Sequence, residues 1–348
     1  MFQPRYTITN QLLANIKRIN TLIGELNNRR FSSVVLIALE KSARSLSTHA
    51  STSIEGNPLP LTEVKKILKS KPEHIRDSER EVLNYNQALI TLQKQQGKQF
   101  SLLSFEYILH IQKQVTSGLL PAFESGSLRQ KPVVVNNPKT HQVAFLPPDV
   151  QDVKPLMLEL VQYIHQNKGH IDPLIIAGIF HKQMVIIHPF MDGNGRTTRL
   201  ATKILLAQMG LNTFNLFSFE NYYNQNVSRY FQTVGEYGDY YELKNKIDFT
   251  VWLEYFTEGI IDELLRVQKL LAEAGIDPRT ELQEHDRKLL KHMKEQGFIT
   301  DKRYAALVTR AKATRTKDFK RLLSLGYIKR KGKGKATYYI LKDESSLQ

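Results

Sequence analysis

Apolar residues recur every three or four positions along most of this chain, a spacing that is typical of helices with one buried face. The spacing predicts helices over residues 7–30, 31–50, 62–69, 77–96, 101–116, 150–167, 173–187, 195–209 and 248–271. Asn27 and Asn28 interrupt the first pattern, and Gly56 and Pro58 end whatever precedes them. Thr62 is expected to cap the third helix, because its hydroxyl can accept a hydrogen bond from the first turn.

Two parts of the chain have the pattern of strands. Residues 132–146 contain two short extended runs around a turn, which predicts a β-hairpin. Near the C-terminus, patterns for three short helices (286–296, 301–307 and 312–325) precede two short strands around a turn rich in Lys and Gly. Because helical spacing covers the rest, broken within 248–271 only at Gly259, the chain is predicted to be mainly α.

The composition excludes several classes of protein. The 348 residues include no Cys, which rules out disulfide scaffolds, thiolate zinc sites, iron–sulfur clusters and a cysteine nucleophile. No run of about 18 apolar residues is present, so no membrane partner is expected. The N-terminus lacks the apolar stretch and cleavage site of a signal peptide, and the expected location is the cytoplasm.

Positive charge is concentrated in residues 284–342, which hold eighteen Lys and Arg against five Asp and Glu. Gly275 and Pro278 mark residues 273–283 as a linker before this module. The helix–helix–helix–hairpin pattern resembles a winged helix-turn-helix, which implies nucleic-acid contact through the recognition helix. The expected contacts are Arg315, Lys317 and Arg321. The alternatives are a solvated basic surface, or a docking or dimerisation module that has kept its charge.

Residues 188–199 combine the groups that binding and transferring a phosphate requires, and they read His-Pro-Phe-Met-Asp-Gly-Asn-Gly-Arg-Thr-Thr-Arg. A Gly-Asn-Gly turn between two helices lets several backbone N–H groups converge at a helix N-terminus, where the positive field favours phosphate. Arg196 and Arg199 lie on one face of the first turn and can hold further phosphate oxygens. Asp192 offers a hard oxygen ligand for Mg²⁺, and His188 can accept a proton near neutral pH.

Each of these residues also has an ordinary structural explanation. A histidine at a helix end is commonly just hydrogen-bonded, aspartate is a common turn residue, and a Gly-Asn-Gly turn alone is a weak signal. His181 could be proposed as a further metal ligand, but a hydrogen-bonded core histidine explains it better. The Gly-Lys-Gly-Lys segment near the C-terminus lacks the spacing of a Walker loop and does not open a helix. The hypothesis therefore rests on the joint pattern.

That joint pattern resembles the signature of the Fic family, and every specified position matches. The resemblance implies a helical Fic core over residues 99–272, with a β-hairpin flap, preceded by an N-terminal helical region over 1–98. It also implies transfer of AMP from ATP to a Ser, Thr or Tyr hydroxyl of a target protein. His188 would be the base and Asp192 the ligand of Mg²⁺. The implied ATP and phosphate-binding residues are Phe190, Gly193, Asn194, Gly195, Arg196, Arg199 and Asn226.

Two further roles follow from the resemblance. The hairpin strand that contains Val143, Ala144 and Phe145 would pair with an extended segment of the target through main-chain hydrogen bonds, although a strand that merely covers the core has the same pattern. Asn226 matches a family asparagine near the nucleotide. Val227 stands where the family often has Arg, so the contacts there are not carried over.

Residues 51–56 match the inhibitory motif of the same family, through Ser51, Glu55 and Gly56. The motif implies that Glu55 forms an ion pair with Arg199 and occupies the place of the γ-phosphate. A misplacement of about 1 Å can cost roughly a hundredfold in rate, so such a carboxylate would act as an intramolecular brake. The alternative is a helix end with a solvated glutamate. In some relatives the same glutamate helps to remove AMP.

The leading hypothesis is therefore an autoinhibited protein adenylyltransferase that modifies target proteins and itself. The first alternative is a DNA-binding regulator whose Fic core senses nucleotides, and the second is an enzyme that mainly removes AMP. The target protein and the oligomeric state stay open, with a homodimer as one option.

Overall fold

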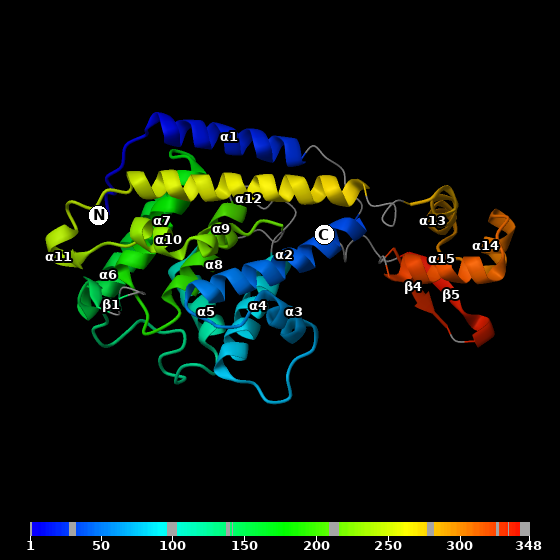
Figure 1. The fold of residues 1–348 in the computed structure, drawn as a ribbon, viewed down its shortest axis with the longest axis horizontal. Coiled ribbons are helices and arrows are strands. Elements are labelled where there is room, and N and C mark those ends of the chain that lie inside the picture. The colour runs from blue at the N-terminus through cyan, green and yellow to red at the C-terminus, as the bar shows by residue number, and fades with distance from the viewer. Residues whose placement is uncertain are drawn as a thin grey trace. The chain divides into compact units, whose positions relative to one another are not determined.

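The computed structural model describes residues 2–27, 33–95, 103–136, 140, 142–208, 216–276, 282–324, 327–332 and 334–341. Helices dominate these residues, as the hydrophobic spacing predicted (Figure 1). The chain divides into two compact units, one of residues 1–29 with 40–267 and the other of residues 30–39 with 268–348. Most of the predicted N-terminal region and of the predicted catalytic core thus belongs to the first unit, while residues 30–39 and 268–272 are assigned to the second.

The N-terminal part of the chain forms four helices, α1 (Asn10–Asn27), α2 (Ser33–Ile54), α3 (Leu61–Lys69) and α4 (Asp77–Gln95). α2 runs four residues beyond the predicted end at residue 50 and stops at the turn that contains Gly56, whose φ is +91°. The prediction that Thr62 caps α3 is wrong. Pro60, with extended backbone angles, precedes the helix, so Thr62 lies inside the first turn.

The following helices are α5 (Phe105–Thr116), α6 (Val150–Asn167), α7 (Pro173–Ile187), α8 (Asn194–Gln208), α9 (Phe219–Gln225), α10 (Val227–Val234), α11 (Tyr240–Leu243) and α12 (Thr250–Ile276). α6 and α7 have the predicted bounds. The predicted end of α8 at residue 209 lies outside the described residues. α9, α10 and α11 were not predicted, because spans of 7, 8 and 4 residues are too short to display a helical period.

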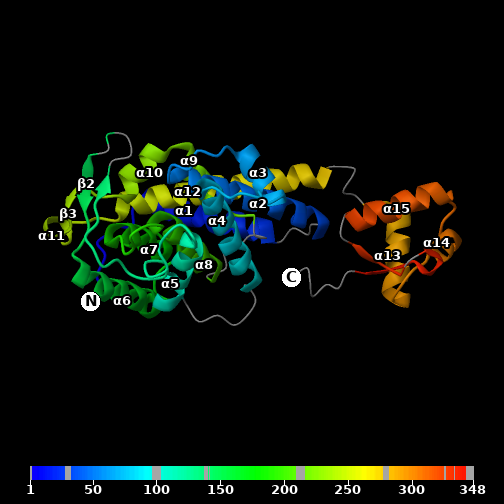
Figure 2. The same ribbon diagram turned by 90° about the horizontal axis from the view of Figure 1, so that it is seen from below.

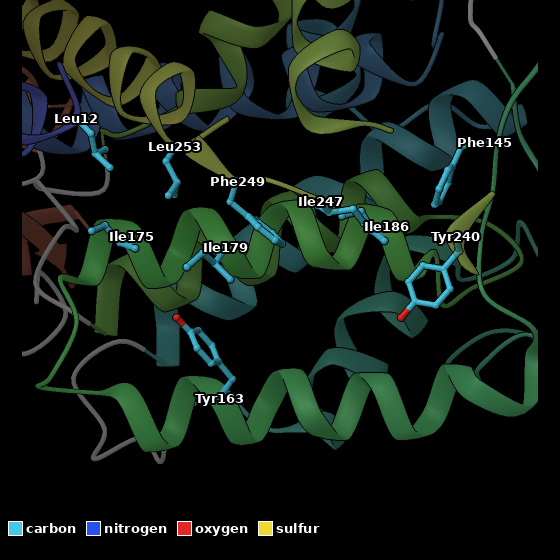
Figure 3. Close-up of a cluster of buried hydrophobic side chains, with 10 residues drawn as sticks. All are labelled: Leu12, Phe145, Tyr163, Ile175, Ile179, Ile186, Tyr240, Ile247, Phe249 and Leu253. Carbon is cyan, nitrogen blue, oxygen red and sulfur yellow. The ribbon is translucent and has the colours of Figure 1, made fainter. Parts of the chain in front are cut away.

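α7 is the central helix of the first unit. Its residues are mostly apolar and nearly all buried, as expected for a helix with neighbours on every side, and the polar His181, Lys182 and Gln183 are buried with them. It packs against α6, α8 and α10. Figure 3 shows Ile175, Ile179 and Ile186 along α7, with Tyr163 of α6 pointing toward them. This packing fixes the C-terminal end of α7, where the candidate site begins.

α12 packs on α7 and on α1, which runs beside it (Figures 1 and 2). The indole N–H of Trp252 donates to the carbonyl of Gly178 in α7 at 2.8 Å, and Asn15 of α1 hydrogen-bonds to α12. The predicted break at Gly259 is wrong, since α12 continues through it. A Cβ at Gly259 would lie 2.8 Å from Tyr222 Cδ1, so the glycine serves close packing on α9.

The predicted hairpin is confirmed, and it belongs to a three-stranded sheet. β1 (Val135–Asn136) pairs antiparallel with β2 (Val143–Leu146), and β2 pairs in parallel with β3 (Gly238–Asp239). The two-residue strand β3 was too short to predict. Because the order is β1-β2-β3, β2 is the central strand, and its residue Phe145 is buried in the core and paired on both sides.

The C-terminal unit has the predicted order of elements, α13 (Glu284–Gln296), α14 (Asp301–Leu307), α15 (Lys312–Ser324), β4 (Ile328–Lys331), the 3₁₀ turn η2 (Gly334–Ala336) and β5 (Tyr338–Leu341). β4 and β5 form an antiparallel hairpin. Phe319 of α15 stacks on Tyr339 of β5 with ring centroids 4.0 Å apart, so this small core ties the helices to the hairpin. α12 extends to Ile276, into the start of the predicted linker.

Across the described ranges, no helix combines the length and the apolar character that crossing a bilayer requires.

Candidate active site

His188 forms the end of α7 in an unusual backbone conformation. Its φ of 48° is in the left-handed region, and among the described residues it is the one non-glycine residue with positive φ. Such a conformation costs about 1–3 kcal/mol and is concentrated at functional sites. The N–H of His188 still donates to Met184 at 3.1 Å, so the turn is part of the helix end. Burial lowers the pKa of the imidazole, which keeps it neutral near pH 7.

One buried arginine, Arg129, hydrogen-bonds to the backbone of the loop that begins at His188. Arg129 Nε donates to the carbonyl of His188, and its backbone N–H donates to the carbonyl of Pro189, both at 2.9 Å. A third bond runs from Arg129 Nη2 to the carbonyl of Pro148, which follows β2. Arg129 therefore fixes the His188 backbone and joins it to the flap.

The same loop is closed from inside by Asn194, the first residue of α8. Its side-chain oxygen accepts from the N–H of Phe190, and its side-chain nitrogen donates to the carbonyl of Phe190, both at 2.9 Å. The ring of Phe190 is fully buried. The structure thus gives Asn194 and Phe190 a clear part in building the loop, while the resemblance had implied contact with nucleotide.

The first turn of α8 is the candidate cradle for an anion. Gly193 has a φ of +79°, which favours glycine, and its carbonyl accepts from the N–H of Thr197. Arg196 and Arg199 follow on this turn with buried side chains. In Arg199, Nη1 has no hydrogen-bond partner among the described residues, and the same is true of Arg196 Nε. These unused donors suit an anionic ligand.

A carboxylate from the turn after α2 already occupies part of this candidate cradle. Arg199 Nη2 lies 2.7 Å from Glu55 Oε1, and the arginine also donates to the hydroxyl and the carbonyl of Ser51, each at 2.8 Å. A Cβ built on Gly195 would lie 2.1 Å from Glu55 Oε1, so glycine is needed for this approach. Burial opposes the charge of Arg199, but Glu55 raises the pKa of the guanidinium above its usual value. The predicted partners Ser51, Glu55 and Arg199 are therefore brought together, while Gly56 shapes the turn that follows.

Arg196 is held by two acidic groups. Its Nη1 lies 2.7 Å from Glu81 Oε1 of α4, and its Nη2 lies 2.8 Å from Asp192 Oδ2. Glu81 was not singled out in the sequence, because one glutamate on a polar-faced helix gives no signal. Asn57, two residues after Glu55, donates to the second oxygen of Glu81 at 2.6 Å.

Buried polar side chains of α4, α8 and α9 form a hydrogen-bonded network that reaches α2. Tyr85 of α4 donates to Glu220 Oε1 at 2.8 Å, and Lys203 of α8 lies 3.0 Å from Glu220 Oε2. Lys203 also donates to the hydroxyl of Ser47 on α2 at 2.5 Å. The fully buried charge of Glu220 is thus compensated, and α2 is joined to α8 away from the turn that contains Glu55.

His181 has the structural role that explained it better than metal binding. Its two ring nitrogens lie 3.0 Å from the hydroxyl of Tyr230 and 3.1 Å from that of Thr202, inside a cluster of aromatic rings. Burial places its pKa well below the usual value. Tyr230 is itself buried and stacks on Tyr223. Asn226 is exposed and caps α10 by accepting from Arg229 N–H, so its observed role is structural.

The residues present fit a magnesium ion that arrives with a nucleotide. Asp192 has a half-exposed carboxylate beside the cradle, and the described residues contain no group of three or more His, Asp or Glu that could hold a metal ion by protein ligands alone. Mg²⁺ is commonly held by one or two carboxylates together with substrate phosphates. Asp192 would be the protein ligand, and it would exchange Arg196 for the ion.

The three basic residues of the C-terminal unit that were expected to contact nucleic acid differ in whether they are paired with a carboxylate or exposed. Arg315 pairs with Asp301 at 2.9 Å, and Arg321 pairs with the buried Asp286. Lys317 is exposed on α15. Two of the three expected nucleic-acid contacts are therefore engaged within the unit, for a reason that sequence spacing does not reveal.

Comparison with known proteins agrees with this geometry. Residues 102–206 match the model of the Fic/DOC family. "Protein adenylyltransferase Fic" of Aedes aegypti is 26% identical over 219 residues, which cover 58% of this chain and 42% of that protein. "Protein adenylyltransferase fic-1" of Caenorhabditis elegans is 28% identical over 201 residues, which cover 56% and 38%. The chain thus spans about two fifths of the length of these curated relatives.

Solved structures show the same fold. A Fic family protein from Desulfovibrio desulfuricans G20 is 19% identical, with a TM-score of 0.66 over 98% of both chains. Fic-1 of Caenorhabditis elegans is 21% identical, with a TM-score of 0.60 over 76% of this chain and 73% of that one.

Proposed function

Because residues 102–206 belong to the Fic/DOC family, we propose that this chain is a protein adenylyltransferase held inactive by its own Glu55. It transfers AMP from ATP to a hydroxyl group of a target protein, or of itself. The observation that carries the proposal is the Glu55 carboxylate 2.7 Å from Arg199, which lies seven residues beyond the metal-ligand candidate Asp192, in a loop that begins at the buried His188 with its lowered pKa.

The chemistry assigns a separate task to each group. The target hydroxyl oxygen attacks the α-phosphorus of ATP, the bond from that phosphorus to the bridging oxygen breaks, and pyrophosphate leaves. His188 takes the hydroxyl proton, which its lowered pKa permits near pH 7. The N–H groups at the start of α8, with Arg196 and Arg199, hold the phosphate oxygens. Mg²⁺, when bound beside Asp192, would neutralise phosphate charge.

The brake acts by occupying the place of phosphate. Glu55 uses the Nη2 group of Arg199 and the space above Gly195, so the γ-phosphate has to displace a charged group or bind out of line. Since rate depends steeply on alignment, either outcome suppresses transfer.

The flap supplies a docking edge for the target over part of its length. β3 covers Phe145 and Leu146, whereas Val143 and Ala144 precede its register. We therefore assign target pairing to Val143 and Ala144, and the buried Phe145 anchors the strand.

Labelling with ATP tests the proposal. The full chain, its Glu55→Gly variant and the double variant with His188→Ala are incubated with Mg²⁺ and ATP labelled on the α-phosphate or, as a control, on the γ-phosphate. We expect protein labelled from the α-position only, strongly in Glu55→Gly and not in the double variant. Labelling from the γ-position would indicate a kinase, and no labelling of any kind would refute AMP transfer.

Two other functions remain proposals. An enzyme that mainly removes AMP would release it from AMP-modified protein and need Glu55. A DNA-binding role for a winged helix over residues 284–342 is favoured by the exposed basic side chains Lys317, Lys320, Lys329, Arg330 and Lys331. The homodimer and the cytoplasmic location stay predictions.

A further inference from the structure

Each arginine of the candidate phosphate site is paired with a carboxylate from the N-terminal part of the chain. Glu55 holds Arg199, and Glu81 holds Arg196. The second pair is well enclosed, with 5% of the Arg196 side chain and 14% of the Glu81 side chain exposed. The proposed inhibitory motif accounts for the first pair and leaves the second without a function.

Glu81 lies between two parts of the site. Its Oε1 faces Arg196 Nη1 at 2.7 Å, and its Oε2 accepts from Asn57 Nδ2 at 2.6 Å. Asn57 is held to α4 a second time, since it also donates to the carbonyl of Ser78, and it is fixed within its own turn by accepting from the N–H of Leu59. One carboxylate therefore joins the first arginine of α8 to the turn that carries Glu55.

Glu81 and Asp192 contact Arg196 in different ways. Asp192 is on the loop, half of its side chain is exposed, and it would turn to Mg²⁺ when nucleotide binds. Glu81 is on α4, a helix held to the core through Tyr85, so it is placed to stay on Nη1 throughout. A guanidinium with one edge fixed presents its remaining N–H groups in a set direction.

We propose that Glu81 is a positioning residue with two linked effects: it aims Arg196 at the phosphates and, through Asn57, holds the Glu55 turn in the inhibitory position. The proposal rests on the proposed function, which makes this site bind ATP. It adds that release of the brake and alignment of Arg196 share one carboxylate.

The aiming effect is tested without the brake, in the Glu55→Gly protein. There Glu81→Gln should lower kcat/KM for AMP transfer and the calorimetric affinity for ATP by roughly tenfold or more, because a neutral amide does not fix the guanidinium. Glu81→Asp should recover part of both. Glu63→Gln, which alters a half-exposed glutamate of α3, is the matched control and should change neither. Unchanged ATP affinity and kcat/KM in Glu81→Gln would overturn the aiming effect.

The tether is tested in the chain that keeps Glu55. There Asn57→Ala should raise AMP transfer severalfold, and in the Glu55→Gly protein it should change kcat/KM by less than about twofold. If Asn57→Ala left the rate of AMP transfer unchanged in the chain that keeps Glu55, the proposed tether would be overturned. If Glu55→Gly itself transfers no AMP, the proposed function fails, and ATP affinity still decides the role of Glu81. A thermal melt of every variant shows whether a loss of activity comes from a loss of fold. If Glu81→Gln unfolds, the activity and ATP affinity of Glu81→Asp decide the role of Glu81.

Discussion

At the scale of single residues, His188 concentrates the features that a base needs. Its left-handed backbone conformation costs free energy. Packing of the rigid helix before it and the hydrogen bonds of Arg129 to the loop after it offset that cost. Its Nδ1 lies 3.4 Å from the carbonyl of Val185, a weak contact that orients the ring without fixing the charged form. The imidazole is thus held in place and kept neutral.

Replacement of this side chain separates chemistry from binding. In the Glu55→Gly protein, His188→Ala should abolish AMP transfer and leave the calorimetric affinity for ATP within about threefold, because the cradle of α8 stays intact. A variant that transferred AMP at the rate of its parent would show that another group accepts the proton.

The pH dependence follows from the lowered pKa of His188. Only the neutral imidazole accepts a proton, and burial lowers the pKa below 6.5, the ordinary value for histidine. The Glu55 carboxylate acts in the opposite direction, so its removal lowers the pKa further. We expect transfer by the Glu55→Gly protein to rise with pH through an inflection below 6.5 and to be flat between about pH 7 and 8. An inflection at pH 7 or above, in single-turnover measurements, would contradict this.

At the scale of elements, the candidate site is the meeting point of α2 and α8. The N-terminus of α8 attracts negative charge, and Glu55, in the turn directly after α2, supplies it at the point where Gly195 leaves room. Ser51, one helical turn earlier, fixes the other side of Arg199. The chain of Tyr85, Glu220 and Lys203 holds α2 independently, so the inhibitory carboxylate can change without loss of the helix contact.

Removal of the carboxylate should therefore activate the protein at a modest cost in stability. Glu55→Gly should raise AMP transfer at saturating ATP and Mg²⁺ by tenfold or more, since a few kcal/mol of pairing is released and each 1.4 kcal/mol is tenfold. The free energy of unfolding in urea should fall by about 2 kcal/mol, the usual value of a hydrogen bond to a charged group.

Arg199→Ala is the matched comparison for this variant. It removes the partner of the brake together with the contact to phosphate, so it should activate much less than Glu55→Gly. Equal transfer rates of the unaltered chain and the Glu55→Gly protein would refute inhibition by Glu55.

At the scale of the whole molecule, the charge of the chain is divided between two units with different surroundings. The first unit pairs its functional arginines with carboxylates. In the C-terminal unit Arg315 and Arg321 are paired too, but Lys317, Lys320 and Lys329 are exposed. The exposed lysines, and not the paired arginines, are therefore the groups able to meet a polyanion.

DNA binding by the full chain should depend on these lysines. Replacement of Lys317, Lys320 and Lys329 by Ala should weaken binding to duplexes of any sequence and lower the slope of log affinity against log salt by about 0.9 for each lost phosphate contact. Fluorescence anisotropy over a salt series measures this. Lys65→Ala, an exposed lysine of α3, is the control. Absence of duplex binding at low salt would leave the docking role for this unit.

The sequence alone determined most of the helices and the catalytic loop. Helical spacing is a local property, so long amphipathic or apolar segments such as α6 and α7 were predicted with their bounds. The residues from His188 to Arg199 are consecutive, so the candidate base, the candidate metal ligand, the glycine turn and the arginines appear together in the sequence. The resemblance to a family added Glu55, which lies 144 positions from its partner.

Only the tertiary structure decided which side chains from distant helices meet at that loop. Glu81 and Asn57 have ordinary surroundings in the sequence, and their link to Arg196 exists because α4 and the turn after α2 pack beside α8. The same holds for β3, which is too short to have a pattern and which makes β2 a central strand. A period along the chain reports which face of an element is buried, but it does not report which element covers that face.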